Sequence, residues 1–97
     1  MATLNELADA AREAAEAAET KYQSLSPIDQ VDAKAKRDEV LDNWALAEVK
    51  ILQSTRLITD QDLKDMKALK DEIDQAADTQ QLIVALGRLA ISLAKFV

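Results

Sequence analysis

Residues 3–24 read TLNELADAAREAAEAAETKYQS, and the spacing within this stretch decides the fold. Its apolar residues recur at alternating steps of three and four, which places them on one face of an α-helix. This face, called the alanine seam below, consists of Leu4, Leu7, Ala11, Ala14 and Ala18. Thr3 and Glu6 have the spacing of a capping box, so the helix is predicted to begin beside Thr3. Because most of the seam is alanine, a neighbouring helix can approach it closely.

The first helix is predicted to end at a short turn that begins the second. Ser26 is a favourable N-cap, and Pro27 suits the first position of a helix. A turn this short predicts an antiparallel helical hairpin. The second helix should run to about residue 54. Its first half is largely polar between residues 32 and 39, so the sequence leaves open whether the helix is continuous there.

Two more helices are predicted, with Thr59 and either Asp78 or Thr79 as their N-caps. Gln81 would complete a capping box if Asp78 is the cap. The last helix is apolar on most sides, which predicts a place in the middle of the bundle, with Gly87 against the alanine seam. The sequence therefore predicts an all-α four-helix bundle that begins with an alanine-rich antiparallel hairpin. One domain, residues 1–97, contains helices at about 3–24, 27–54, 60–77 and 79–96.

Composition argues against most catalytic and cofactor chemistry. The 97 residues include no Cys and no His, which excludes disulfides and removes the commonest general base and transition-metal ligand. Asp60, Asp62 and Asp65 superficially suggest a calcium loop, but Lys64 and a missing glycine break that pattern, and acids in a first turn normally serve the cap. No catalytic residue, no metal and no cofactor is therefore predicted, and the chain is expected not to be an enzyme.

The net charge and the hydropathy of the chain limit what it is expected to bind and where it is expected to be located. A net charge of −6 argues against direct binding to nucleic acid. The apolar stretch 82–97 has 16 residues and contains Arg88, whereas a bilayer span needs about 20, so no transmembrane segment is predicted. The first residues lack the features of a signal peptide, and the chain is predicted to be cytoplasmic.

Two surfaces are candidate binding sites. The first, the acidic stripe, is predicted on one side of the first helix, where only Arg12 is close enough to neutralise it. In the third helix, by contrast, the acidic residues should be neutralised by ion pairs along the helix, Asp60–Lys64 and Lys67–Asp71. The second is a group of apolar residues on the second and fourth helices that exceeds what one small core requires. These residues are predicted to form a homodimer interface; the alternative is that the first and third helices cover them within one chain. The stripe comprises Glu6, Asp9, Glu13 and Glu16, and the apolar residues are Leu46, Val49, Val84 and Ile91.

These surfaces lead to three hypotheses. The first is a non-enzymatic protein–protein interaction module, a small acidic regulator, inhibitor or adaptor. One form is an inhibitor of a nucleic-acid enzyme, such as a phage counter-defence or toxin-neutralising protein, whose partner would be basic. The second is a homo-oligomeric scaffold subunit that associates through the second and fourth helices. The third is a membrane-surface protein.

Overall fold

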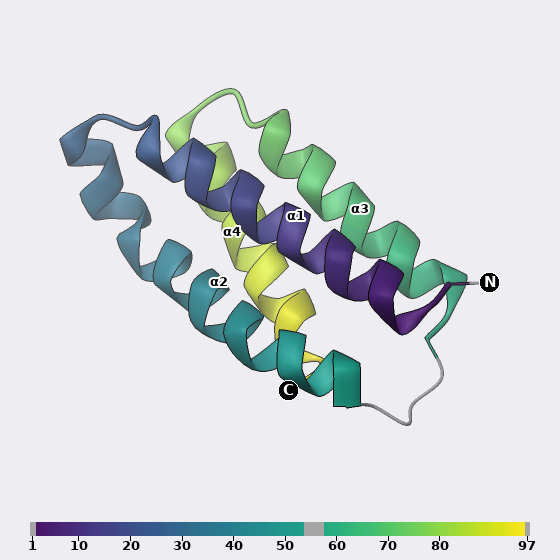
Figure 1. Cartoon of the computed structure of the whole chain (residues 1–97). Helices are drawn as coiled ribbons and strands as arrows, with labels where there is room; N and C mark the ends of the chain where they lie inside the picture. The colour runs from purple at the N-terminus through teal and green to yellow at the C-terminus, as the bar shows by residue number, and fades with distance from the viewer. Residues whose placement is uncertain (1, 54–57, 97) are drawn as a thin grey trace.

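The computed structural model describes residues 2–53 and 58–96, and its regular elements are four helices (Figure 1). Within these residues there is no strand, and the prediction of an all-α four-helix bundle is confirmed. Residue 54, the predicted end of the second helix, lies outside the described residues. The helices are α1 (Leu4–Gln23), α2 (Pro27–Gln53), α3 (Asp60–Asp74) and α4 (Thr79–Ala94).

Capping boxes fix the beginnings of α1 and α3, at the two N-caps, Thr3 and Thr59, that the sequence predicted. The Thr3 hydroxyl accepts a hydrogen bond from the Glu6 N–H at 3.1 Å, and the Glu6 carboxylate accepts one from the Thr3 N–H at 3.2 Å. Thr59 and Asp62 make the same reciprocal pair, with both distances 3.1 Å. Each box satisfies backbone N–H groups that the first helical turn leaves without partners.

The connection between α3 and α4 differs from the prediction in two details. Asp78 caps α4 and accepts from the Gln81 N–H at 2.8 Å, but Gln81 accepts in turn from the Ala77 N–H at 2.9 Å, so the predicted box is not closed. The third helix also ends at Asp74, three residues before its predicted end at 77. The reason is that Asp78 is extended, with φ −145° and ψ 173°, and the chain must turn before it.

The second helix is continuous through its polar half, which answers the question left open above. Lys34 bonds Asp38 at 2.6 Å, and Lys36 lies 3.5 Å from Glu39, so charges there pair along the helix. Ala33 is fully buried and anchors this half to the rest of the bundle.

An aromatic and ionic contact holds the hairpin of α1 and α2 together. The guanidinium carbon of Arg37 lies 4.2 Å from the centroid of the Tyr22 ring, and the ring is buried beneath it. Arg37 also lies 3.4 Å from Glu19, so α2 is tied to α1 by both a cation–π contact and an ion pair. Helical spacing alone did not indicate this cluster.

The helices occupy the corners of the bundle in an order that the sequence did not predict (Figure 1). α1 packs mainly against α3 and α2, whereas α4 packs mainly against α2. The Ala2 N–H donates to Asp60 at 2.6 Å, which joins the beginnings of α1 and α3 and makes them parallel. Asn43 donates to the Ala90 carbonyl at 3.0 Å, between the parallel helices α2 and α4. The bundle therefore has two layers, α1 with α3 and α2 with α4.

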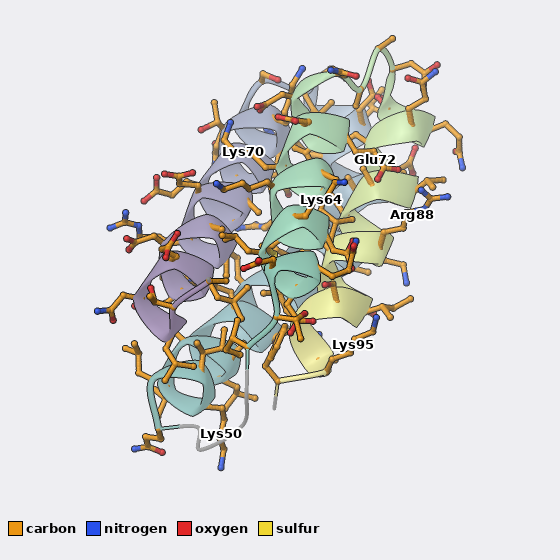
Figure 2. The ribbon with its side chains drawn as sticks, turned by 90° about the vertical axis from the view of Figure 1, so that its right-hand side faces the viewer. Lys50, Lys64, Lys70, Glu72, Arg88 and Lys95 are labelled. Atoms are coloured by element: carbon orange, nitrogen blue, oxygen red, sulfur yellow. The ribbon has the colours of Figure 1, made fainter. Side chains whose placement is uncertain are left out.

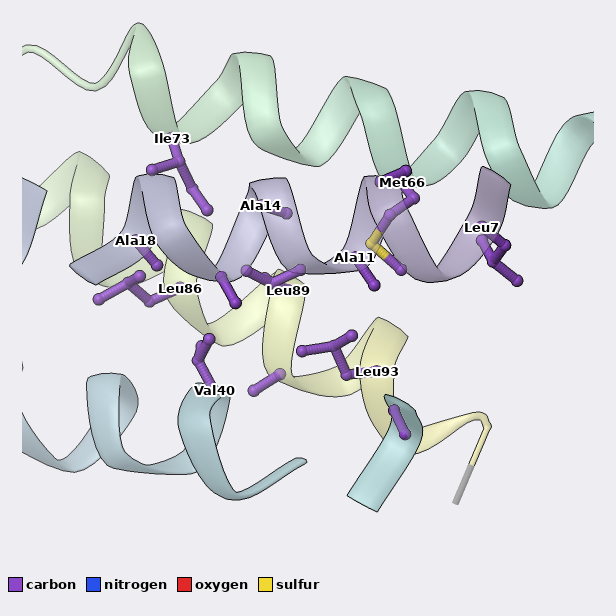
Figure 3. Packing of buried hydrophobic residues seen from close by; sticks show 14 of the residues in the cluster. Leu7, Ala11, Ala14, Ala18, Val40, Met66, Ile73, Leu86, Leu89 and Leu93 are labelled. Atoms are coloured by element: carbon purple, nitrogen blue, oxygen red, sulfur yellow. The ribbon is translucent and has the colours of Figure 1, made fainter. Parts of the chain in front are cut away.

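The core is aliphatic, and the alanine seam lies at its centre (Figure 3). The seam alanines leave room for larger side chains that reach the same space from α2, α3 and α4. These larger residues include Val40, Met66, Ile73, Leu86, Leu89 and Leu93, all of which are buried.

The predicted central position of α4 is wrong. Ile91 is 67% exposed and Val84 is 48% exposed, so one side of α4 faces solvent. Gly87 does not meet the alanine seam, because the atoms nearest to it outside α4 belong to the Lys36 side chain of α2. The leucines of α4 occupy the centre instead, and the small residues beside them are left to face α2.

This position of Gly87 allows a stability prediction. A Cβ added there would meet only Lys36 Cδ at 3.9 Å and Cε at 4.0 Å, which is ordinary contact. Because Gly in a helix interior costs about 0.5–1 kcal/mol relative to Ala, we expect Gly87→Ala to raise the free energy of unfolding by about that amount. Urea denaturation followed by circular dichroism measures the change. A loss of stability would mean that α2 and α4 require a closer approach than this.

Candidate interaction surfaces

The acidic stripe lies along the outer side of α1, as predicted, and all four of its carboxylates are exposed. A cation lies within it: the Arg12 guanidinium is 3.7 Å from Asp9 and 3.9 Å from Glu16. These pairs are mostly exposed, so they restrain the side chains only weakly.

The prediction that only Arg12 can neutralise the stripe is wrong. Lys67 of α3 lines a hollow between α1 and α3 together with the first three carboxylates of the stripe. Lys70 donates to Asp74 at 2.7 Å; this hydrogen bond raises the pKa of Lys70, and the carboxylates of Asp71 and Glu13 act in the same direction. The physical reason is that α3 packs parallel to α1 and brings its lysines to the edge of the stripe.

The ion pairs predicted within α3 are also replaced. Asp60 accepts the Ala2 N–H instead of pairing with Lys64. Among the described residues, the ion pairs that involve α3 are Lys70–Asp74 within the helix and Glu72–Arg88, at 2.9 Å, between α3 and α4. The acids of the first turn thus serve the cap and the N-terminal segment.

The predicted apolar residues are exposed on α2 and α4, so the alternative that α1 and α3 cover them is wrong. Leu46 and Val49 are 53% and 52% exposed. In the described part of the chain, every large hydrophobic side chain that is exposed lies on α2 or α4. This exposed apolar set comprises Ile28, Val31, Leu46, Val49, Leu52, Val84 and Ile91.

Sequence reasoning missed three members of the set, Ile28, Val31 and Leu52. Leu52 follows Val49 by three residues, and Val31 follows Ile28 by three, so both pairs share a side of the helix. That spacing was a signal that could have found them. It was hidden because α2 also has a buried side, which made its apolar residues look like one broad core face.

A groove between α3 and α4 borders the apolar surface of α4. Its volume is about 340 Å³, and Leu69, Ile91, Arg88 and Lys95 are among the residues that line it. Figure 2 shows Glu72 and Arg88 facing each other across these two helices, with Lys95 farther along α4. Asp65 and Glu72 also line the groove, so charges of both signs flank its apolar residues, and Lys95 is a cation there without an ion pair among the described residues.

A smaller hollow lies between α1 and α2 beside Trp44. Leu41 and Trp44 line it from α2, with Ala15, Glu16 and Glu19 among its residues on α1. Trp44 packs against the core, as an anchor would, but its indole Nε1 is buried without a hydrogen-bond partner among the described residues.

The cations in the first half of α2 have carboxylate partners, whereas the charged residues of its second half form no ion pair among the described residues. Asp38 accepts from Lys34, and this hydrogen bond, together with the nearby charge of Arg37, lowers the pKa of Asp38. Asp42 and Lys50 are exposed, and neither forms an ion pair within the part of the chain that the structure describes.

Clusters of metal ligands and membrane-spanning helices are both absent from the part of the chain that the structure describes. Residues 2–53 and 58–96 contain no group of three or more acidic residues placed to hold a metal ion. No helix in the same residues is long and apolar enough to cross a bilayer. Comparisons with protein-family models, with curated protein sequences and with solved structures give no match.

Proposed function

We propose that this chain is a non-enzymatic protein–protein interaction module that binds through the outer sides of α2 and α4. The observation that carries the proposal is the segregation of exposed apolar side chains onto one layer of the bundle, the α2–α4 layer. Exposed apolar side chains beyond what a small core needs often mark an association site in soluble proteins. A compact chain without Cys or His has few reactive groups and acts most simply by occupying a partner's surface.

The α4 part of this surface suggests the chemistry of a partner. Val84 and Ile91 lie seven residues apart, which is two helical turns, so they point the same way. Arg88, which is paired with Glu72 of α3, lies between them in the sequence, and Lys95 follows one turn after Ile91. An apolar segment that carries acidic residues would complement this arrangement, with the apolar contact supplying affinity and the charges supplying specificity.

The acidic stripe supports a second form of the same function, the docking of a basic partner. Glu6 and Glu13 are exposed and form no ion pair among the described residues. An inhibitor of a nucleic-acid enzyme, of a phage counter-defence or toxin-neutralising kind, would use such a surface, and its binding would weaken as salt increases. The lysines of α3 reduce the charge of the stripe, and for this reason we place the apolar surface first.

One capture experiment separates these two forms. The tagged chain is used to retain proteins from an extract of its native host, and the retained proteins are quantified by mass spectrometry. The variant Val84→Glu with Ile91→Glu changes the apolar surface, and Glu6→Lys with Glu13→Lys changes the stripe. A control, Thr20→Glu with Gln61→Glu, adds two charges at exposed polar positions of α1 and α3.

We expect the unmodified chain and the control to retain a partner in similar amounts. The amount retained by the α4 variant should be lower by about tenfold or more. Circular dichroism should show unchanged helicity, because both substituted side chains face solvent. If only the stripe variant loses the partner, and retention by the unmodified chain falls as salt increases, the function belongs to the acidic stripe instead. Retention that is equal for all variants would contradict both forms.

A further inference from the structure

The outer side of the second half of α2 has a symmetric pattern of charge and apolar side chains. Asp42, Leu46 and Lys50 follow one another at steps of four, so they share one side of the helix. Leu46 is half-exposed and lies midway between a carboxylate and an ammonium group that form no ion pair within residues 2–53 and 58–96. Asp42 and Lys50 are eight residues apart, about 12 Å along the helix axis.

Apolar side chains surround Leu46 on the same surface. Val49 and Leu52, each 52% exposed, lie one and two turns farther along α2, and Ala45 beside them is exposed and small. The opposite side of this half is held in the core by Ala47 and Ile51. The helix is therefore fixed with one row of apolar residues inside the bundle and another facing solvent.

We propose that α2 of a second copy of this chain occupies this surface, antiparallel to the first, with the two-fold axis beside Leu46. This arrangement places Lys50 of each copy opposite Asp42 of the other, since both lie four residues from the axis. Leu46 of one copy then packs beside Leu46 and Val49 of the other. A parallel arrangement would instead bring Asp42 to Asp42 and Lys50 to Lys50, and like charges in contact oppose association.

Charge complementarity is what favours a second copy over an unrelated helix. The other cations in the middle of α2, Lys34, Lys36 and Arg37, already have carboxylate partners within the chain. Asp42 and Lys50 have opposite signs at equal distances from Leu46, so an antiparallel pairing about a two-fold axis beside Leu46 brings each of them to the other. The proposal rests on the proposed function, because it names the occupant of the α2 part of the same surface and leaves α4 free for another partner.

Sedimentation equilibrium over a range of concentrations, at low salt, tests the pairing. The apolar contact is small, so we expect a reversible dimer whose fraction rises with concentration. Asp42→Lys and Lys50→Asp should each weaken dimerisation about tenfold or more, because each creates two like-charge contacts. An equimolar mixture of the two variants should regain association, since each chain then supplies the charge that the other lacks. Leu46→Glu should leave a monomer.

Matched controls on the other layer are Asp71→Lys and Lys64→Asp, which make the same charge changes at exposed positions of α3 and should leave the dimer intact. A chain that stays monomeric at millimolar concentration would overturn the inference. So would equal weakening by the α3 controls, or a mixture of Asp42→Lys and Lys50→Asp chains that fails to associate. If the chain is a monomer but the α4 variant still loses its partner, the dimer alone is refuted. If the chain is a dimer but the α4 variant retains the same partner as the unmodified chain, the α4 binding site alone is refuted.

Discussion

Leu89→Ala is expected to lower the free energy of unfolding by about 2–5 kcal/mol, which is the usual cost of removing a buried leucine side chain. Leu89 is fully buried on α4 and faces the alanine seam of α1 (Figure 3). The alanines have no side chain that could move into the space left behind, so most of the cavity should remain. For a chain of 97 residues, a loss of this size is a large part of the total stability.

Urea denaturation measures this effect, with circular dichroism reporting helicity and the single tryptophan, Trp44, reporting packing. Ile91→Ala is the matched control, because it truncates an aliphatic side chain on the same helix two residues later. Ile91 is 67% exposed, and we expect its truncation to change stability by no more than about 0.5 kcal/mol. Equal losses for the two variants would mean that Ile91 is covered in solution.

Helical spacing was sufficient to predict the elements of this fold and the side that most of them bury. The three-and-four steps from Leu4 to Ala18 and the caps at Thr3 and Thr59 specify local structure, and the structure reproduces them. Such patterns indicate which side of a helix is apolar, but they do not identify the helix that packs against that side. The order of the helices around the bundle therefore could not be read from the sequence.

The composition of α4 explains why it was wrongly predicted to lie in the middle of the bundle. Apolar residues lie on most of its sides, and burial of all of them was the simplest expectation. The leucines at 82, 86, 89 and 93 form one side that is sufficient to fill the centre of the bundle. Val84 and Ile91 are then left in solvent, and their exposure is a property of the whole packing arrangement that one helix cannot reveal.

The candidate surfaces were predictable to different degrees. Leu46, Val49, Val84 and Ile91 were found because they exceed what a single small core can bury. The charge of the acidic stripe was overestimated, because spacing within one helix says nothing about cations such as Lys67 that a parallel neighbour supplies. Electrostatic partners across helices are set by tertiary packing, and packing also decides which pairs form along a helix, since Asp60 accepts the Ala2 N–H instead of pairing with Lys64.

Ala14→Leu should also destabilise the bundle, by about 1–3 kcal/mol, but for the opposite reason. Ala14 is fully buried in the alanine seam, and α1 packs there against α3 while the leucines of α4 approach from the core. A leucine would need space that neighbouring side chains already occupy, so the helices would have to separate or adopt unfavourable rotamers. Helix propensity hardly differs between the two residues, which leaves packing as the cause.

Ala68→Leu makes the same substitution at an exposed position of α3 and should leave stability within about 0.5 kcal/mol. The comparison is made by thermal and urea unfolding of both variants beside the unmodified chain. If the Ala14→Leu variant has the same unfolding midpoint as the unmodified chain, then α1 does not approach its neighbours as closely as in the structure. The alanine seam would then serve helix formation alone, and the close packing of α1 against the core would have to be abandoned.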